Sequence, residues 1–255
     1  FQPEVGTQVA SRFVAEGDAF VDELAVTVTK GTWIRVGGQP VEVTATGTLY
    51  GPFDEQPAES DVPPAGAPVV GAEDVALTGP GSYTSPGTIT APESGFYTWV
   101  WAIDKNAQGE TGKYLTDSFT DRFGKVAETS VVPFQPHAVS EADQHLAVPG
   151  DALTDTITVS SSNGAWLKRD GAFIPVVFEG TAYQGAWHPA PGPGRRRAGR
   201  RGAAGHRDGH GGRPRRLHLT CGCRTARRVR DLGLGGAKEH AARVGARRPR
   251  RRLDR

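Results

Sequence analysis

The most constraining feature of this chain is an internal repeat with a period of 133 residues. Phe1-Gln2-Pro3 recurs as Phe134-Gln135-Pro136, and without any gap residues 1–50 match residues 134–183 at 15 positions. Composition alone would give roughly 3 or 4 such matches. A period of this length indicates tandem structural units, each of which buries its own apolar residues or packs against a neighbour.

The repeated unit has the residue pattern of short β-strands. Residues 20–29 (FVDELAVTVT) alternate between polar and apolar residues, which predicts a strand with one buried face. A hairpin is expected after Trp33, with Gly37-Gly38 as its turn; the second copy has Asp170-Gly171 there, a strong hairpin signal. Residues 51–72 are rich in Pro, Gly and acidic residues and predict a loop. Further strands are expected near residues 75–77, 83–84, 88–90 and 96–103.

These patterns predict an all-β protein built of immunoglobulin-like β-sandwich repeats. Residues 1–133 are expected to form a complete β-sandwich repeat, and residues 134–187 the N-terminal part of a second, incomplete one. Residues 188–255 form a basic, low-complexity tail that is expected to be disordered. The chain contains no Met and opens on Phe1, so we interpret it as a piece of a longer protein.

The charge distribution sets the tail apart from the rest of the chain. The whole chain has a formal net charge of +2, but residues 1–187 carry −15 and residues 188–255 carry +17. All 20 aromatic residues lie at or before Trp187, so the tail cannot bury enough apolar surface to offset chain entropy. The tail is therefore not expected to belong to the packed part of the protein.

The tail also has the composition of a GC-rich gene translated out of frame. Shifted by one base, residues 213–220 can encode GPGDYTSP, residues 231–234 TWVW and residues 249–255 LADDWTD. The first copy has GPGSYTSP at 79–86, TWVW at 98–101 and LTDSFTD at 115–121. Three ordered matches at offsets of 133 or 134 favour a frameshift between Tyr183 and Pro189. Binding of nucleic acid or another polyanion through the Arg-rich tail is the competing interpretation, and no specific nucleic-acid partner is expected.

The tryptophans are one candidate for a ligand-binding site, and the ligand itself is unknown from the sequence. Trp99 and Trp101 share a strand face because they are two residues apart. Core packing is expected for Trp33, Trp99 and Trp166, and Trp101 is the weak candidate for a ring that stacks on a glycan. The acidic residues of the 51–72 loop are expected to be solvated.

No catalytic, cofactor or metal residue is predicted, and we expect a protein that is not an enzyme. Cys221 and Cys223 with nearby histidines lack the spacing of structural zinc sites. The recurring aspartates lack EF-hand spacing and are expected at turns and strand edges; they are Asp18, Asp22, Asp151 and Asp155. A Lys30–Asn106 isopeptide bond is disfavoured because the second copy has Asn163 at the position of Lys30. No apolar run approaches the roughly 20 residues of a membrane span.

The repeat motifs resemble a known class of protein. The stretches GDAFVDELAVTV, GTWIRVGGQPV, GTLYGPFDEQPAES and GFYTWVWAI are similar to tandem repeats of large actinobacterial surface proteins that are anchored to the cell wall by sortase. The resemblance covers residues 1–183 in frame. It implies an extracellular, cell-wall-attached location, although this chain includes neither an export signal nor an anchor.

The resemblance implies a structural stalk or spacer, whose partners are the neighbouring repeats of the same chain. The alternative is an adhesion module that binds a host or environmental glycan or protein through the Trp101 face or the 51–72 loop. A third interpretation is polyanion or nucleic-acid binding by the tail. A solvent-facing Trp101 would favour adhesion, whereas a buried one would favour the stalk.

The frameshift makes a prediction about the coding DNA. Sequenced across residues 183–189 and translated in the shifted frame, the gene should continue with YTSP, TWVW and an LxDxWTD-like stretch, without stop codons. Stop codons in that frame would make the basic tail a genuine C-terminus and would require salt-dependent DNA binding to be tested.

Overall fold

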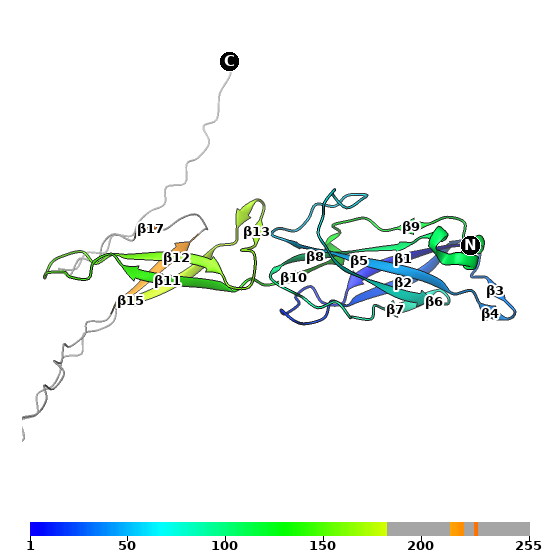
Figure 1. Cartoon of the computed structure of the whole chain (residues 1–255), viewed down its shortest axis with the longest axis horizontal. Coiled ribbons are helices and arrows are strands. Elements are labelled where there is room, and N and C mark those ends of the chain that lie inside the picture. The colour runs from blue at the N-terminus through cyan, green and yellow to red at the C-terminus, as the bar shows by residue number, and fades with distance from the viewer. Residues whose placement is uncertain (183–214, 222–226, 229–255) are drawn as a thin grey trace, which may run out of the picture. The chain divides into compact units, whose positions relative to one another are not determined.

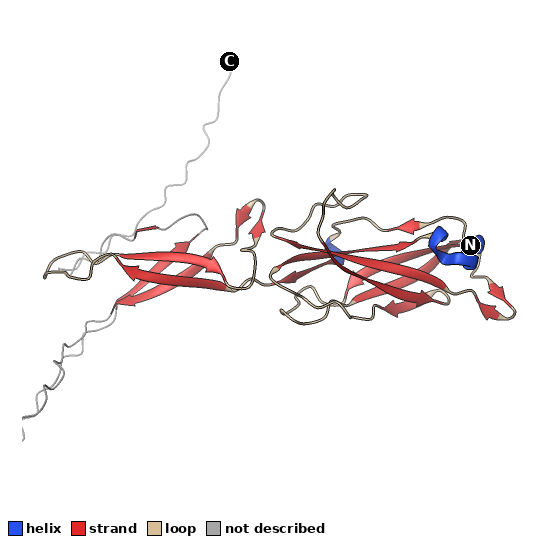
Figure 2. Ribbon diagram, viewed as in Figure 1, coloured by secondary structure: helices blue, strands red, loops and turns tan. Residues whose placement is uncertain are grey.

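The computed structural model describes residues 1–182, 215–221 and 227–228. These residues divide into two compact units, which are described separately: residues 1–138 with 159–182 and 215–221, and residues 139–158 with 227–228. Most of the described residues that have regular structure lie in antiparallel strands, and only two short 3₁₀ helices interrupt them (Figures 1 and 2). The prediction of an all-β protein is confirmed.

Residues 1–133 contain two large antiparallel sheets and a separate two-stranded hairpin. The first sheet has the order β1-β2-β7, in which β1 is Gln2–Val9, β2 is Asp22–Lys30 and β7 is Gly81–Thr84. The second has the order β10-β8-β5-β6, with β9 also paired to β8. Its strands are β5 (Val43–Phe53), β6 (Val69–Leu77), β8 (Gly95–Ile103), β9 (Phe119–Thr120) and β10 (Thr129–Val132). The helices are η1 (Lys105–Tyr114) and η2 (Val126–Glu128).

One hydrophobic core joins the two sheets. Strand β2 alternates as its sequence predicts, so that Leu24 and Val26 are buried while Glu23 and Ala25 are exposed. From the other sheet, β8 buries seven of its nine residues, which indicates a strand covered on both faces. The core members all lie within residues 5–132, so the first repeat contains its complete core.

The expected hairpins are confirmed in both copies. Strands β3 (Arg35–Val36) and β4 (Gln39–Pro40) pair across Gly37-Gly38, and β13 (Lys168–Arg169) and β14 (Ala172–Phe173) pair across Asp170-Gly171. All four turn residues have positive φ, between 54° and 83°. Two-residue hairpin loops need this conformation at both positions, which Gly adopts freely and Asp tolerates.

The expected strand at residues 88–90 is wrong. Only Thr90 forms an isolated bridge, to Ala19. The buried carboxylate of Glu73 instead accepts hydrogen bonds from the backbone N–H groups of Gly87, Thr88 and Ile89. A side chain thus satisfies the donors that a neighbouring strand would otherwise take.

The loop expected at 51–72 is shorter than predicted. Strand β5 continues to Phe53 and β6 begins at Val69, so the loop itself covers residues 54–68. The Gly and Pro residues that suggested a loop lie partly inside the two strands, at Gly51, Pro52 and Gly71. Gly51 has φ 143°, and a Cβ there would lie 2.6 Å from the ring of Tyr97.

The second copy begins with the same strand pattern as the first. Its three-stranded sheet has the order β11-β12-β17, and β15 pairs with β16. These strands are β11 (Pro136–Ala142), β12 (Asp155–Ser161), β15 (Val176–Ala182), β16 (Arg215–Cys221) and β17 (Arg227–Arg228). Between residues 134 and 182 only Trp166 and Leu167 are buried. Apart from β16 and β17, the expectations for the tail lie outside the described residues.

Gly47 makes a testable prediction about the core. A Cβ at Gly47 would lie 2.6 Å from the ring of Trp101. Since this ring is fully buried, we expect Gly47→Ala to lower the free energy of unfolding by about 1–3 kcal/mol, the usual cost of overpacking. Urea denaturation followed by tryptophan fluorescence measures the change.

The repeat supplies a matched control for this substitution. Gly180 is the equivalent glycine of the second copy, and a Cβ there meets nothing within 4 Å. Gly180→Ala should therefore leave the unfolding transition within about 0.5 kcal/mol of the wild type. Equal effects of the two substitutions would contradict the close packing of Gly47 on Trp101.

Candidate functional site

The candidate functional site is a junction, where the hairpin segment of the second copy contacts the first repeat. Ser94, at the start of β8, is fully buried. Its N–H donates to the carbonyl of Asn163 at 2.7 Å, and its Oγ donates to the carbonyl of Ala165 at 2.8 Å. Ser94 and Gly164 form a parallel β-bridge between these bonds. The second copy is thus held by its backbone.

Gly164 is the residue that allows this close approach. Its φ is 124°, and a Cβ would lie 2.8 Å from the Oγ and 3.0 Å from the N of Ser94. Any other residue would both strain the backbone and displace Ser94. The sequence showed that this glycine recurs as Gly31, but only the structure shows that Gly164 makes room for Ser94.

A second set of contacts comes from the acidic loop. The backbone N–H of Lys168 donates to the carbonyl of Asp54 at 2.7 Å, and its ammonium lies 2.6 Å from the Asp54 carboxylate. The carboxylate of Glu55 accepts a hydrogen bond from the N–H of Gly171 at 2.8 Å. We call Asp54, Glu55 and Ser94 the receiving end of the first repeat.

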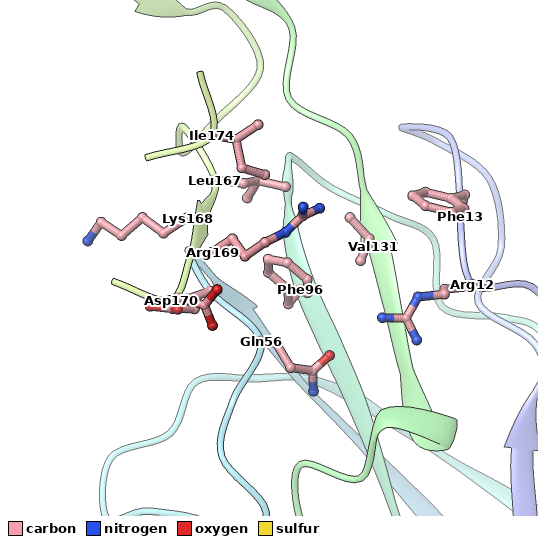
Figure 3. Close-up of a pocket in the computed structure, with 11 residues that line it drawn as sticks. Arg12, Phe13, Gln56, Phe96, Val131, Leu167, Lys168, Arg169, Asp170 and Ile174 are labelled. Atoms are coloured by element: carbon pink, nitrogen blue, oxygen red, sulfur yellow. The ribbon is translucent and has the colours of Figure 1, made fainter. Parts of the chain in front are cut away.

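Apolar contact completes the junction. Trp166 and Leu167 keep only 7% and 2% of their surface exposed. Figure 3 shows Leu167, Arg169 and Ile174 of the hairpin segment facing Phe96 of β8 and Val131 of β10. A pocket of about 410 Å³ remains between them, and Arg12, Phe13 and Gln56 contribute to its wall.

Asn163 fixes the segment between the copies. Its Oδ1 accepts a hydrogen bond from the N–H of Gln135 at 2.7 Å, and its Nδ2 donates to the carbonyl of Pro133 at 3.1 Å. The first copy has Lys30 at this position. Lys30 is exposed at the end of β2 and Asn106 is exposed in η1, surroundings unlike the buried setting that an isopeptide reaction would need.

We expected the acidic residues of the 51–72 loop to be solvated, but several of them make specific contacts. Besides the contacts of Asp54 and Glu55, the guanidinium of Arg122 pairs with the carboxylates of Glu59 and Asp61. Ser60 also exchanges two backbone hydrogen bonds with Phe123. These contacts hold the loop against the first repeat, so that its first residues are placed for the junction.

Trp101 is not available to a ligand, which corrects its candidacy as a glycan-stacking residue. Its side chain is fully buried and stacks on Trp99 with a ring-centroid distance of 5.6 Å. Its Nε1 donates to the carboxyl of Asp22 at 2.6 Å. The ring is inside because β8 is covered on both faces, which alternation within β8 did not reveal.

Asp22 and Glu128 form a buried carboxyl pair beneath Trp101. Burial, together with the charge of Glu128, raises the pKa of Asp22 to about 8, so Asp22 is protonated at neutral pH. Burial also raises the pKa of Glu128, which accepts a hydrogen bond from the hydroxyl of Thr7 and lies 3.6 Å from the ammonium of Lys125. The proximity of the two carboxyl groups therefore favours the protonated form of Asp22.

The other predicted site residues have structural surroundings. Trp33 and Trp166 each donate an Nε1 hydrogen bond of 2.7 Å to a backbone carbonyl of their own hairpin segment, those of Val41 and Ile174. Asp18 lies in a turn, whereas Asp22 is internal rather than at a strand edge. Asp151 accepts a hydrogen bond from the N–H of Val148.

No metal site can be assigned within the described residues, where no three His, Cys, Asp or Glu side chains cluster suitably. Cys223, which we considered and set aside as a zinc ligand, lies outside the described residues. In the part of the chain that the structure covers, no helix has the length and apolar character needed to cross a membrane.

Sequence reasoning missed Ser94 and Glu128. Both are polar residues within or next to apolar stretches, and nothing in a local pattern distinguishes them from surface residues. The sequence held a weak signal for the pairing of Lys168 with Asp54. Both copies have a cationic residue at this position, Arg35 and Lys168, and Asp54 lies in an acidic loop.

Comparisons with known proteins add no identification. No protein-family model matches the chain, and no curated protein and no solved structure matches it either.

The buried carboxyl pair predicts a pH dependence of stability. In the unfolded chain Asp22 titrates near 3.8, whereas in the folded protein it titrates near 8. Between these pH values the folded state binds the extra proton, so the free energy of unfolding falls by up to about 1.4 kcal/mol per pH unit as the pH rises. Asp22→Asn keeps an acceptor for Trp101 and a donor for Glu128 and should reduce this slope.

Urea denaturation at pH 5, 6, 7 and 8 measures the slope. Asp18→Asn, which removes an exposed carboxyl on the preceding turn, serves as the control and should retain the wild-type slope. An Asp22→Asn variant with the same slope as the wild type would show that Asp22 is ionised in the folded protein.

Proposed function

We propose that this protein is a structural spacer, a non-catalytic stalk made of tandem immunoglobulin-like β-sandwich repeats. One observation carries the proposal: the second copy is joined to the first by backbone hydrogen bonds, an ion pair and buried apolar residues, rather than by a free linker. Repeat proteins gain stiffness from such nearest-neighbour contacts. A stiff series of repeats holds whatever lies at its end at a set distance.

The chemistry of the junction supports a mechanical role. On the side of the second copy, the hydrogen bonds to the receiving end use only backbone groups, which any sequence supplies, and one pair of opposite charges adds to them. The buried Trp166 and Leu167 exclude water from the bonds around Ser94. Desolvated hydrogen bonds of this kind resist opening more than exposed ones.

The resemblance of the repeats to actinobacterial surface proteins supports an extracellular, cell-wall-attached location. In that setting the spacer would carry an adhesive domain away from the wall, and its partners would be the neighbouring repeats. The burial of Trp101 favours this proposal over a glycan-binding module, since the ring cannot stack on a sugar.

The second candidate is an adhesion module, and the junction pocket is the feature that favours it. The pocket places the exposed ring of Phe13 beside Arg12, and its wall includes Arg169 (Figure 3). Glu55 also lines it. Such mixed groups suit a peptide or glycan with a carboxylate. Binding by the basic tail, a third candidate, concerns residues that the structure does not describe.

Single-molecule energy transfer tests the spacer. Dyes attached at Glu110→Cys in the first repeat and Val177→Cys in β15, with Cys221 and Cys223 replaced by Ser, report the distance across the junction. A spacer predicts one narrow distribution of transfer efficiency. Gly164→Ala should broaden it and accelerate exchange of the Ser94 amide at least tenfold, because the new Cβ displaces Ser94.

Gly31→Ala is the matched control. Gly31 also has positive φ, 78°, but a Cβ there comes no closer than 3.6 Å to any atom and touches no residue of the junction. This variant should keep the narrow distribution despite similar backbone strain. A broad distribution in the wild-type chain would refute the spacer. In that case tight binding of a carboxylated glycan or peptide, lost in Arg12→Ala, would favour adhesion.

A further inference from the structure

The two copies of the hairpin segment, residues 31–41 and 164–174, are built alike. Each tryptophan packs on the phenylalanine that opens its repeat, with ring-centroid distances of 4.9 Å for Phe1–Trp33 and for Phe134–Trp166. Each segment is also closed by a backbone bond of 2.9 Å, from Val41 to Ile34 and from Ile174 to Leu167. The internal contacts of the two segments therefore do not account for any difference in burial.

The burial nevertheless differs. Trp166 and Leu167 are buried, whereas their equivalents Trp33 and Ile34 are only half-buried. Lys168 is half-buried, whereas Arg35 is exposed. The difference arises because the receiving end of the first repeat covers the second segment, and within the described residues nothing covers the first in the same way.

The uncovered segment keeps the features with which the covered one contacts the receiving end, although Lys30 stands at the preceding position where the second copy has Asn163. Gly31 stands where Gly164 admits Ser94, and Arg35 stands where Lys168 meets the carboxylate of Asp54. The remaining bonds of the junction use carbonyl and N–H groups of the backbone, which are the same in both copies. Among the described residues Arg35 makes no ion pair; its Nε donates to the carbonyl of Gly38.

We infer that the face of hairpin segment 31–41 is a docking surface for the receiving end of a further copy of this repeat. Gly31 would admit its Ser94, and Arg35 would pair with its Asp54. The junction already present in the chain indicates that the partner is another copy of the repeat. Charge indicates the same, because the cationic segment would meet the acidic loop of that copy. The inference rests on the proposed spacer function and names its partner.

The docking surface and the junction lie where a series of repeats, each joined to the next, would need them. The β3–β4 hairpin projects at one end of the first repeat, and β13 lies at the opposite end (Figure 1). Contacts between two different surfaces of the same unit are head-to-tail, and surfaces at opposite ends of the unit let such contacts continue from one repeat to the next. Each repeat would thus carry one surface of each kind.

A fused chain tests the inference, with one more copy of residues 1–133 placed before Phe1 and with Cys221 and Cys223 replaced by Ser. Asp54→Cys in the added copy is combined with Arg35→Cys in the chain. In the existing junction, the backbone bond between residues 54 and 168 brings their Cα atoms within the range of a disulfide. We expect disulfide yields within twofold of those of the pair Asp54→Cys and Lys168→Cys in the chain itself.

The negative control replaces Arg35→Cys by Glu23→Cys, an exposed position within β2. It should link to the added copy at least tenfold less. If residue 35 links no better than residue 23 while the 54–168 pair forms, the inference is overturned and the spacer remains. If the 54–168 pair also fails, the spacer is overturned as well.

Hydrogen exchange gives a second measurement without cysteines. The amide of Arg35 should exchange at least tenfold more slowly in the fused chain than in the chain alone, and Ile34→Val in the added copy distinguishes the two sets of peptides. Arg35→Lys should retain this protection, whereas Arg35→Glu, which faces a carboxylate, should abolish it. Equal exchange in the fused and unfused chains would overturn the inference.

Discussion

The hydrogen bond between Trp101 and Asp22 is the interaction on which the first repeat depends. It joins β8 of one sheet to β2 of the other at a point where both side chains are fully buried. Gly47 leaves room for the indole, and Glu128 and Thr7 continue the polar contacts below it. An internal carboxyl is tolerated because it is protonated and bonded, which avoids burial of an unpaired charge.

The second copy shows what the absence of this interaction means. Asp155 is the equivalent of Asp22, and its Oδ1 has no hydrogen-bond partner among the described residues. The described residues of the chain end before the position equivalent to Trp101. Residues 134–182 accordingly bury only Trp166 and Leu167, and they do so against the first repeat. The junction thus supplies the second copy with burial that it lacks internally.

Much of the fold followed from local patterns. Alternation in residues 20–29 predicted β2, the apolar stretch at 96–103 predicted β8, and turn residues placed both hairpins. The expected strand at 88–90 failed because Glu73, distant in sequence, satisfies that backbone. Strand β1 and strand β10 carried weaker signals, since β1 contains Pro and Gly and β10 is only four residues long.

The candidate site was harder to predict than the fold. The repeat identified Gly31 and Gly164, Trp33 and Trp166, and Arg35 and Lys168 as equivalent pairs, but equivalence does not state what a residue contacts. Trp101 was a candidate for ligand binding on its strand face, and only the burial of β8 in the structure showed that both faces are covered.

By itself the sequence determined the period of 133 residues, the β-strand content and the turns, because these depend on side-chain alternation and on backbone conformations that only a few residues adopt. The tertiary structure alone decided that Asp22 is an internal, protonated carboxyl and that Ser94, Asp54 and Lys168 meet at a junction. The physical reason is that burial and long-range contacts depend on which surfaces come together, and residues 71 or 114 positions apart leave no local pattern of that contact.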